Sequence, residues 1–500
     1  MIRRLRRLPI RRRFAQAKQL VNYCETKVTT LPNGLRVATE DMGLPTTCVG
    51  LWIDCGTRYE KLEEMGTAHF FEHLVFKGSA KMSQHELSEY AEATGTLLNA
   101  YTSREHTSYY FQGRRDNTEK LVEILADVIQ KPDLSRSAIA IERRVISAEY
   151  DDILANYEEV LFDYIHAFCF GGVDGHFTDS SLSYNILGTR FHISNAITKD
   201  VIQNFIKTHY HPSRMVLVGT GGVNHAQVVD FAGKYFDDWG PYIGPGTPTF
   251  EREATLPSGR TDHYANFWGA DTPFHSCEIR HHKPGSDTLV GCVTYPICGW
   301  SHSDCLTMNL IAKLIGVFMH GSGGFQFFTS PFVKKMQALD QSSTFKAYMS
   351  LYNDKGLFGF IFTAFELDKA SAIVDAFHEE LERIATALSD EELSNAKRSL
   401  FTDICLGIDG TQPVADEIGR HLLVYNRRIH YPETEYLIEN ISREDVKRCV
   451  TQIIESKEKC IALLGNLDHT PPVFPDVPQI NDPEKVHEEA FCKNIITARK

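Results

Sequence analysis

The sequence has no uninterrupted apolar run of eighteen or more residues, so a helix that spans a membrane is not expected. It also has no low-complexity block, and its 42% hydrophobic and 23% charged residues are the composition of a folded protein. The 500 residues exceed what one hydrophobic core usually serves. Two or more domains are therefore expected.

Paired cysteines are also missing, because the 12 cysteines are scattered and none of them forms a CxxC motif. Disulfide frameworks are typical of small secreted domains, and a chain of this length does not need such links. The pattern predicts reduced thiols, and it argues against a zinc site built from cysteines.

Acidic residues are absent from the first 24 residues, where arginines and one lysine contribute eight positive charges. An arginine-rich, acid-free N-terminus is typical of a mitochondrial transit peptide, and we expect residues 1–24 to be one. A cleavage point after Arg13, near Phe14 or Ala15, would suit this reading. The alternative is a basic arm that binds nucleic acid or a membrane surface.

The rest of the chain is strongly acidic. The full chain carries a net charge of −13, so residues 25–500 carry −21 once the eight N-terminal positive charges are set aside. Such a balance is poorly suited to nucleic acid and attracts cationic ligands. The alternative is that the acidity only keeps the protein in solution, and a localised acidic site would decide between the two.

One internal repeat is visible. Residues 197–225 align without a gap to residues 441–469, with an offset of 244. Each copy reads as a helix capped by Thr198 or Ser442, followed by a short apolar strand and a glycine turn. The match predicts that a unit of nearly half the chain has been duplicated.

The join between the two halves lies in residues 237–262, which are dense in glycine, proline and charge. The expected organisation is a first half at 25–240, a linker at 241–262 and a second half at 263–500.

Both halves mix strands and helices. Strand-like segments such as 47–56 and 357–365 accompany helical patterns such as 118–130. The pattern predicts an α+β fold in which each half is a β-sheet packed against helices.

The segment HFFEHLVFKG holds an HxxEH motif made of His69, Glu72 and His73. Positions i and i+4 share one helix face, so both imidazoles can converge on one ion with Glu72 beside them. Thr67 stands where a helix cap is expected. HxxEH is the inverse of the HExxH order of zinc peptidases. The alternative is an ordinary amphipathic helix that contains two histidines, so the context must decide.

A third ligand is sought in residues 138–168, which read as one long helix rich in acids. Glu142 and Glu149 lie seven residues apart, which places them two turns apart on one face. We expect Glu149 to be the third ligand and Glu142 to lie behind it, where it would orient a ligand. A glutamate on a polar helix face is otherwise simply solvated, and spacing alone does not exclude that reading.

Over about residues 26–470 these features resemble the pitrilysin-type metallopeptidases, and within that family most closely the β-type subunits of mitochondrial processing peptidases. Several motifs occur in the family's order. They are VGLWIDCGTRYEKLEEMGTAHFFEHLVFKG (49–78), LLNAYTSREHTSYYFQ (97–112), IERRVISAEYDD (141–152), LYNDKGLFGFIF (351–362) and DGTQPVADEIGRHLLVYNRRI (409–429). The segment HGSGGFQFF (320–328) is shorter than the glycine-rich loop of the α-type subunits, which favours the β type.

The resemblance implies the roles of the metal-site residues. One Zn2+ would be held by His69, His73 and Glu149, with Glu72 as the general base and Glu142 in support.

The resemblance also implies how substrate is held. Asn99 and Ala100 match an edge strand along which an extended peptide lies, and such an edge offers main-chain hydrogen bonds. Glu159 and Asp163 match two acids that receive the arginine of a basic presequence, and at i and i+4 they share one helix face. The local alternative for these two acids is a solvated acidic face.

The second half lacks HxxEH, and the resemblance implies a catalytically empty copy that faces the first half across a chamber. Tyr348 or Tyr352 would be candidates to assist catalysis from that half, although a core tyrosine is the simpler reading.

Two functions from different classes follow. The first is a zinc endopeptidase that removes presequences in the mitochondrial matrix with an α-type partner subunit, and without nucleic acid. The second is a structural core subunit of respiratory complex III, associated with the inner membrane through the subunits of that complex, and one protein can combine both roles. A structural relative is free to lose ligands, and here HxxEH, Glu142 and Glu149 are all present. Broad degradation of free presequences is disfavoured, because such relatives are about twice as long.

Overall fold

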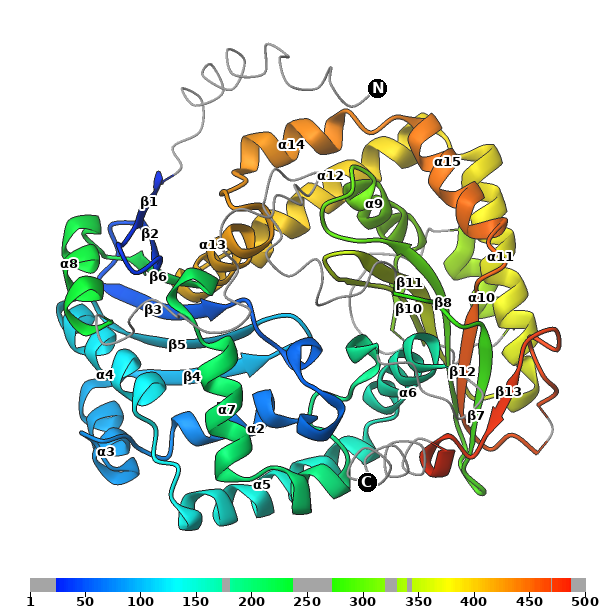
Figure 1. The fold of residues 1–500 in the computed structure, drawn as a ribbon. Coiled ribbons are helices and arrows are strands. Elements are labelled where there is room, and N and C mark those ends of the chain that lie inside the picture. Colours follow the sequence, from blue (N-terminus) through cyan, green and yellow to red (C-terminus); the bar gives the residue numbers. More distant parts are fainter. Residues whose placement is uncertain are drawn as a thin grey trace.

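The computed structural model describes residues 24–172, 180–236, 272–319, 331–339, 344–468 and 470–486 (Figure 1). The predicted transit peptide, apart from Cys24, lies outside these residues, as do the predicted linker at 241–262 and the glycine-rich segment 320–328. No helix within the described ranges combines the length and the apolar character needed to cross a bilayer.

The first half is built on a six-stranded sheet with the order β1-β2-β6-β3-β5-β4. Its strands are β1 (Thr26–Thr30), β2 (Arg36–Asp41), β3 (Thr46–Ile53), β4 (Leu97–Thr102), β5 (Thr107–Arg114) and β6 (Met215–Gly221). Its helices are α2 (Thr67–Val75), α3 (Gln84–Thr94), α4 (Thr118–Gln130), α5 (Arg136–Ala155), α6 (Tyr157–Gly171), α7 (Lys199–His209) and α8 (His225–Tyr235).

The second half is built on a seven-stranded sheet with the order β13-β7-β12-β8-β11-β10-β9. Its strands are β7 (Cys277–His282), β8 (Leu289–Cys298), β9 (Val317–Phe318), β10 (Thr344–Leu351), β11 (Lys355–Ala364), β12 (Cys460–Gly465) and β13 (Gln479–Asn481). Its helices are α9 (Cys305–Ile315), α10 (Pro331–Leu339), α11 (Ala370–Ala387), α12 (Asp390–Gly407), α13 (Thr411–Tyr425), α14 (Tyr431–Glu439) and α15 (Arg443–Ile454).

The two sheets repeat one pairing pattern. β2 pairs with β6 in parallel, as β7 pairs with β12. The next pairs are all antiparallel, β6–β3, β3–β5 and β5–β4 in one sheet and β12–β8, β8–β11 and β11–β10 in the other. This common topology confirms the predicted α+β class and the predicted duplication.

The aligned repeat segments have the same structure. Thr198 caps α7 and Ser442 caps α15, each by accepting a hydrogen bond from a backbone N–H three residues on. The strands that follow, β6 and β12, end at Gly221 with φ 95° and at Gly465 with φ 148°. These positive φ values favour glycine, which explains why both copies keep it at the turn.

One helix of each half packs on the sheet of the other half (Figure 1). Helix α13 packs on the first sheet, where Ile418 and Leu422 lie in one apolar cluster with Trp52. A Cβ on Gly419 would meet the indole of Trp52 at 2.3 Å, so glycine permits this close approach. Helix α6 of the first half packs in turn on β12, β8 and β7 of the second sheet. The halves are therefore interlocked, which their linear order along the chain did not predict.

The prediction of one long helix over residues 138–168 is wrong, because the chain breaks at Asn156 between α5 and α6. Asn156 has an extended backbone, with φ −92° and ψ 99°, and its side chain accepts a hydrogen bond from the Glu158 N–H at 3.2 Å. Asparagine favours such capping positions because its side chain competes for backbone hydrogen bonds. As a result Glu149 and Asp163 lie on separate helices.

Candidate metal centre

Helix α2 carries the HxxEH motif, and a buried carboxylate fixes where it starts. Glu60 accepts hydrogen bonds from the N–H groups of Gly66 and Ala68, each at 2.7 Å. A carboxylate at a helix N-terminus satisfies free N–H groups and complements the helix dipole. The prediction that Thr67 caps the helix is wrong, since Gly66 is the N-cap residue and the Thr67 hydroxyl donates to the Glu64 carbonyl.

The apolar side chains of α2 pack into the core, and its two motif histidines face a second helix, α5. Phe70, Phe71 and Leu74 are fully buried in the core of the first half. The opposite positions, His69 and His73, lie against α5. Helix periodicity thus separates the residues that fold the segment from those that form the site.

The structure brings the three predicted ligands together. His69 Nε2 lies 3.6 Å from Glu149 Oε1, and His73 Nε2 lies 3.2 Å from Glu149 Oε2. The centroids of the two imidazole rings are 4.7 Å apart. Ligand atoms from all three residues lie within 4.8 Å of one another, close enough to bind a common ion.

The chemistry of this donor set fits a metal ion. Two imidazole nitrogens and one carboxylate are the ligands of many catalytic zinc sites, which leave a further coordination position open. Beside them on the same helix, Glu72 Oε2 is buried and has no hydrogen-bond partner among the described residues. A buried carboxylate oxygen without a partner is costly in a purely structural role. The arrangement therefore suits a metal ion with an unpartnered carboxylate oxygen beside it.

The surroundings of Glu149 favour its charged form. The adjacent imidazoles of His69 and His73 hold the pKa of Glu149 well below its usual range. Burial lowers the pKa of His73, but its contacts with Glu149 and Glu142 outweigh burial and leave that pKa raised. Glu149 is therefore ionised at neutral pH, the form that a metal ion binds.

Glu142 lies behind the ligands, as its spacing from Glu149 predicted. Its side chain is 1% exposed, and Oε2 lies 3.2 Å from Nδ1 of His73. Its other oxygen, Oε1, lies 2.8 Å from Lys77 Nζ. Sequence reasoning missed Lys77, which lies in the turn directly after α2.

The segment predicted to hold substrate lies on an edge strand. Asn99 and Ala100 belong to β4, which ends the first sheet and packs against α2. The side chain of Asn99 accepts a hydrogen bond from the Ala100 N–H at 2.8 Å. The open edge therefore adjoins the helix that carries HxxEH.

Glu159 and Asp163 lie on α6 in different surroundings. Glu159 is exposed and accepts a hydrogen bond from Asn156 Nδ2 at 2.8 Å. Asp163 is half-buried, lines a small pocket with Tyr150, and lies 3.1 Å from Arg104 Nη2. Burial raises the pKa of Asp163, and Arg104 opposes that effect. Sequence reasoning missed Arg104, which no spacing rule connects to α6.

The two tyrosines considered in the second half pack against α6. The Tyr352 hydroxyl lies 2.6 Å from His166 Nε2, and the side chain is 8% exposed. The ring of Tyr348 meets Phe162 edge to face, with centroids 4.8 Å apart. Both contacts hold α6 on the second sheet, in agreement with the simpler reading of core tyrosines.

Two family descriptions match the chain. "Insulinase (Peptidase family M16)" matches residues 36–174, which contain the entire candidate metal centre. "Peptidase M16 inactive domain" matches residues 196–400, which contain no HxxEH motif.

The chain is similar over most of its length to β subunits of mitochondrial-processing peptidase. It is 34% identical to that of Mus musculus over 481 residues, which cover 93% of each chain. It is 35% identical to that of Bos taurus, over 91% of this chain and 88% of the relative. With that of Neurospora crassa it shares 34% identity, over 89% of this chain and 88% of the relative.

Two solved structures share the fold. A protease from Helicobacter pylori superposes with a TM-score of 0.73 at 20% identity, covering 88% of this chain and 99% of that chain. A chain of complex III2 from Candida albicans, solved with Inz-5 bound, superposes with a TM-score of 0.72 at 19% identity. That alignment covers 93% of this chain and 100% of the other.

Proposed function

The chain belongs to peptidase family M16, a family of metallopeptidases, and from this premise we propose that it is a zinc endopeptidase that removes N-terminal presequences from imported mitochondrial proteins. The observation that carries the proposal is the convergence of His69, His73 and Glu149 beside Glu72. The similarity to β subunits of mitochondrial-processing peptidase supports presequences as the substrate class.

His69, His73 and Glu149 would hold one Zn2+. When bound there, zinc supplies a positive charge that polarises the scissile carbonyl and lowers the pKa of water. Glu142 would keep the His73 imidazole in the orientation that presents Nε2 to the site, because it accepts a hydrogen bond from Nδ1.

Glu72 would act as the general base. Its buried oxygen has no competing partner among the described residues, so it is free to take a proton from the attacking water. The same carboxyl group would then deliver this proton to the leaving amine, which completes hydrolysis of the peptide bond.

Substrate would lie extended along β4 near Asn99 and Ala100, since an edge strand pairs with the main chain of any extended peptide. Such pairing depends little on the side chains of the substrate, so selectivity for basic presequences would rest on Glu159 and Asp163. Arg104 already neutralises part of Asp163, which leaves the exposed Glu159 as the stronger attractor of a substrate arginine. The charge of −21 on residues 25–500 would assist by steering cationic peptides.

A partner and a location belong to the same proposal. The relatives are named as β subunits, which supports an α-type subunit as the partner of this chain. Residues 1–24 would direct the protein to the mitochondrial matrix as a transit peptide.

Membership of respiratory complex III is the second candidate. The observation in its favour is the shared fold with a chain of complex III2, at an identity that speaks for the fold alone. The complete metal centre favours the peptidase role, because a purely structural subunit has no use for the unpartnered oxygen of Glu72. The two roles are compatible in one protein.

Purification of the tagged full chain from mitochondria, followed by a presequence cleavage assay, tests the proposal. We expect an α-type subunit to co-purify, and zinc-dependent cleavage close after an arginine. Glu72→Gln should retain zinc and the partner yet lose cleavage by about 10²–10⁴-fold. Glu89→Gln, an exposed change on α3, is the matched control. Full cleavage by Glu72→Gln would refute the base assignment, and recovery only with complex III subunits, without cleavage, would favour the second candidate.

A further inference from the structure

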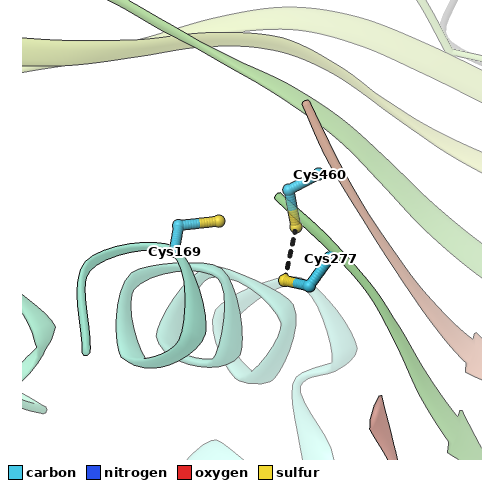
Figure 2. Close-up of side chains that lie close together, drawn as sticks. All are labelled: Cys169, Cys277 and Cys460. Carbon is cyan, nitrogen blue, oxygen red and sulfur yellow. Dashed lines mark hydrogen bonds between the residues drawn. The ribbon is translucent and has the colours of Figure 1, made fainter. Parts of the chain in front are cut away.

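Three cysteines that are far apart in the sequence meet between the two halves (Figure 2). Cys169 lies near the end of α6, and Cys277 and Cys460 are the first residues of β7 and β12. All three side chains are fully buried. Because they come from three separate elements, their scattered positions in the sequence gave no sign of this cluster.

The sulfur atoms face one another. Cys277 and Cys460 are direct partners in the parallel pairing of β7 with β12, and their Sγ atoms lie 3.7 Å apart. Cys169 points toward them from α6, and all three Sγ atoms lie within 4.8 Å of one another (Figure 2). Thiolates bound to a common ion at about 2.3 Å have a similar separation.

His275 is a candidate fourth donor, tied to the cluster through its backbone. His275 stands two residues before Cys277, and its backbone N–H donates a hydrogen bond of 2.7 Å to the Cys169 carbonyl. Its Nε2 is buried and has no hydrogen-bond partner among the described residues.

We propose that Cys169, Cys277 and Cys460 form a structural site for a thiophilic divalent d10 ion of the Zn2+ class, with His275 as the fourth ligand. Three cysteines and one histidine are an established donor set for structural zinc, and the burial of the cluster suits a closed site. A monovalent soft ion such as Cu+ also accepts thiolates. With three thiolates, however, a divalent ion leaves one net negative charge and a monovalent ion leaves two, and the smaller charge costs less in apolar surroundings. Binding releases one proton from each thiol that is still protonated.

The site would fasten α6 to the sheet of the other half. Helix α6 carries Glu159 and Asp163, so an ion at Cys169 would fix the helix that presents the acidic pair. Cys277 and Cys460 already share a strand pairing, and Cys169 is the ligand that brings the first half to them. This role does not involve the candidate metal centre of the first half, which contains no cysteine.

Titration of the reduced, metal-free full chain with Cd2+ tests the proposal, since thiolate-to-cadmium charge transfer reports sulfur ligands alone. We expect two bound ions in the unaltered chain, one of which gives the charge-transfer band. Cys277→Ser should lose that band and one ion, whereas His73→Ala should keep the band and lose the other ion. Cys48→Ser, equally buried in the first half, is the control and should behave as the unaltered chain.

A second pair of measurements keeps the result clear if Cys277→Ser does not fold. Cys169→Ser should also lose the band. Hydrogen exchange in α6 should slow on Cd2+ binding in the unaltered chain and the Cys48→Ser control, but not in Cys169→Ser. His275→Ala should keep the band and weaken binding at least tenfold, and unchanged affinity would remove His275 from the site. Absence of the band in the folded, reduced chain, or a disulfide between Cys277 and Cys460 as isolated, would overturn the proposal while leaving presequence cleavage untouched.

Discussion

Glu142 Oε2 lies 3.2 Å from Nδ1 of His73, a hydrogen bond that joins α5 to α2 behind the metal centre. The other ring nitrogen, Nε2, lies 3.2 Å from Glu149. A proton on Nδ1 is therefore donated in the hydrogen bond to Glu142, and the lone pair of Nε2 is left for a metal ion. Lys77, 2.8 Å from the second oxygen of Glu142, pairs with this buried carboxylate and holds it in place.

Glu142→Gln should weaken zinc binding by about 10–100-fold, the usual effect of losing a hydrogen-bond partner of a ligand histidine. The amide cannot hold the imidazole as a carboxylate does, and it loses the ion pair with Lys77. Competition with a chelator of known affinity measures the change. Asp152→Asn, an exposed change on the same helix, should leave affinity unaltered. Equal affinities in the two variants would show that Glu142 has no role in holding the ion.

Removal of zinc should abolish cleavage, and zinc should restore it only where His73 is present. His73 supplies one of the three converging ligand atoms, so His73→Ala should contain one zinc equivalent fewer by elemental analysis. His85→Ala, a change at a histidine that is exposed on α3, should retain full zinc content and activity. A His73→Ala protein with normal zinc content would contradict the ligand assignment.

Local sequence patterns were sufficient for the parts of the fold that are locally determined. The helix at 118–130 and the strands near 47–56 and 357–365 occur where periodicity predicted them. The helix over HxxEH and the shared face of Glu142 and Glu149 were predictable for the same reason, because helix geometry fixes which side chains share a face.

Contacts between distant segments were beyond such patterns. The ion pair of Arg104 with Asp163, the capping of α2 by Glu60 and the meeting of three cysteines all depend on tertiary packing. The break at Asn156 was locally encoded, but the acids on both sides of it continued a helical pattern and concealed it. The packing of α6 and α13 on the sheet of the opposite half could not be predicted from the order of the elements along the sequence.

Glu159→Gln should reduce kcat/KM for arginine-containing presequence peptides by about tenfold, the lower range expected for losing a charge-assisted hydrogen bond. The effect should appear mainly in KM, because Glu159 is exposed and its loss leaves the metal centre intact. A peptide with citrulline in place of the arginine is the substrate control, and Glu72-dependent cleavage of it should be unchanged by the variant.

The matched variant for this test is Glu158→Gln, which lies on the same helix but forms its ion pair with Lys346. It should cleave both peptides as the unaltered enzyme does. Asp163 is less suited to charge reversal, because Arg104 would then face a like charge. If Glu159→Gln slows both peptides equally, the acidic residue does not read the substrate arginine.

The halves are also joined by an ion pair between the buried Arg58 and Asp354, whose side chain is 37% exposed. Arg58 of the first half is 2% exposed, and its guanidinium makes two hydrogen bonds of 2.7 Å to the carboxylate of Asp354 in the second half. Glu105 shares Arg58 and accepts from the Asn353 N–H at 3.0 Å. Two side chains of one half thus hold a single turn of the other.

Asp354→Asn should lower the free energy of unfolding by about 1.5–3 kcal/mol, the range for hydrogen bonds to charged groups. The loss stays below that of an entirely unpartnered buried charge, because Arg58 keeps its hydrogen bond to Glu105. Burial alone would raise the pKa of Asp354, but its bonds to Arg58 leave it lowered, so the contribution is present at neutral pH and disappears as pH falls through that lowered pKa. Urea unfolding at neutral pH measures the difference. The control is Asp116→Asn, which breaks the exposed ion pair of Asp116 with Arg114 and should lower the free energy of unfolding by no more than about 0.5 kcal/mol. An equal loss of stability in both variants would mean that the Arg58–Asp354 pair does not hold the halves together.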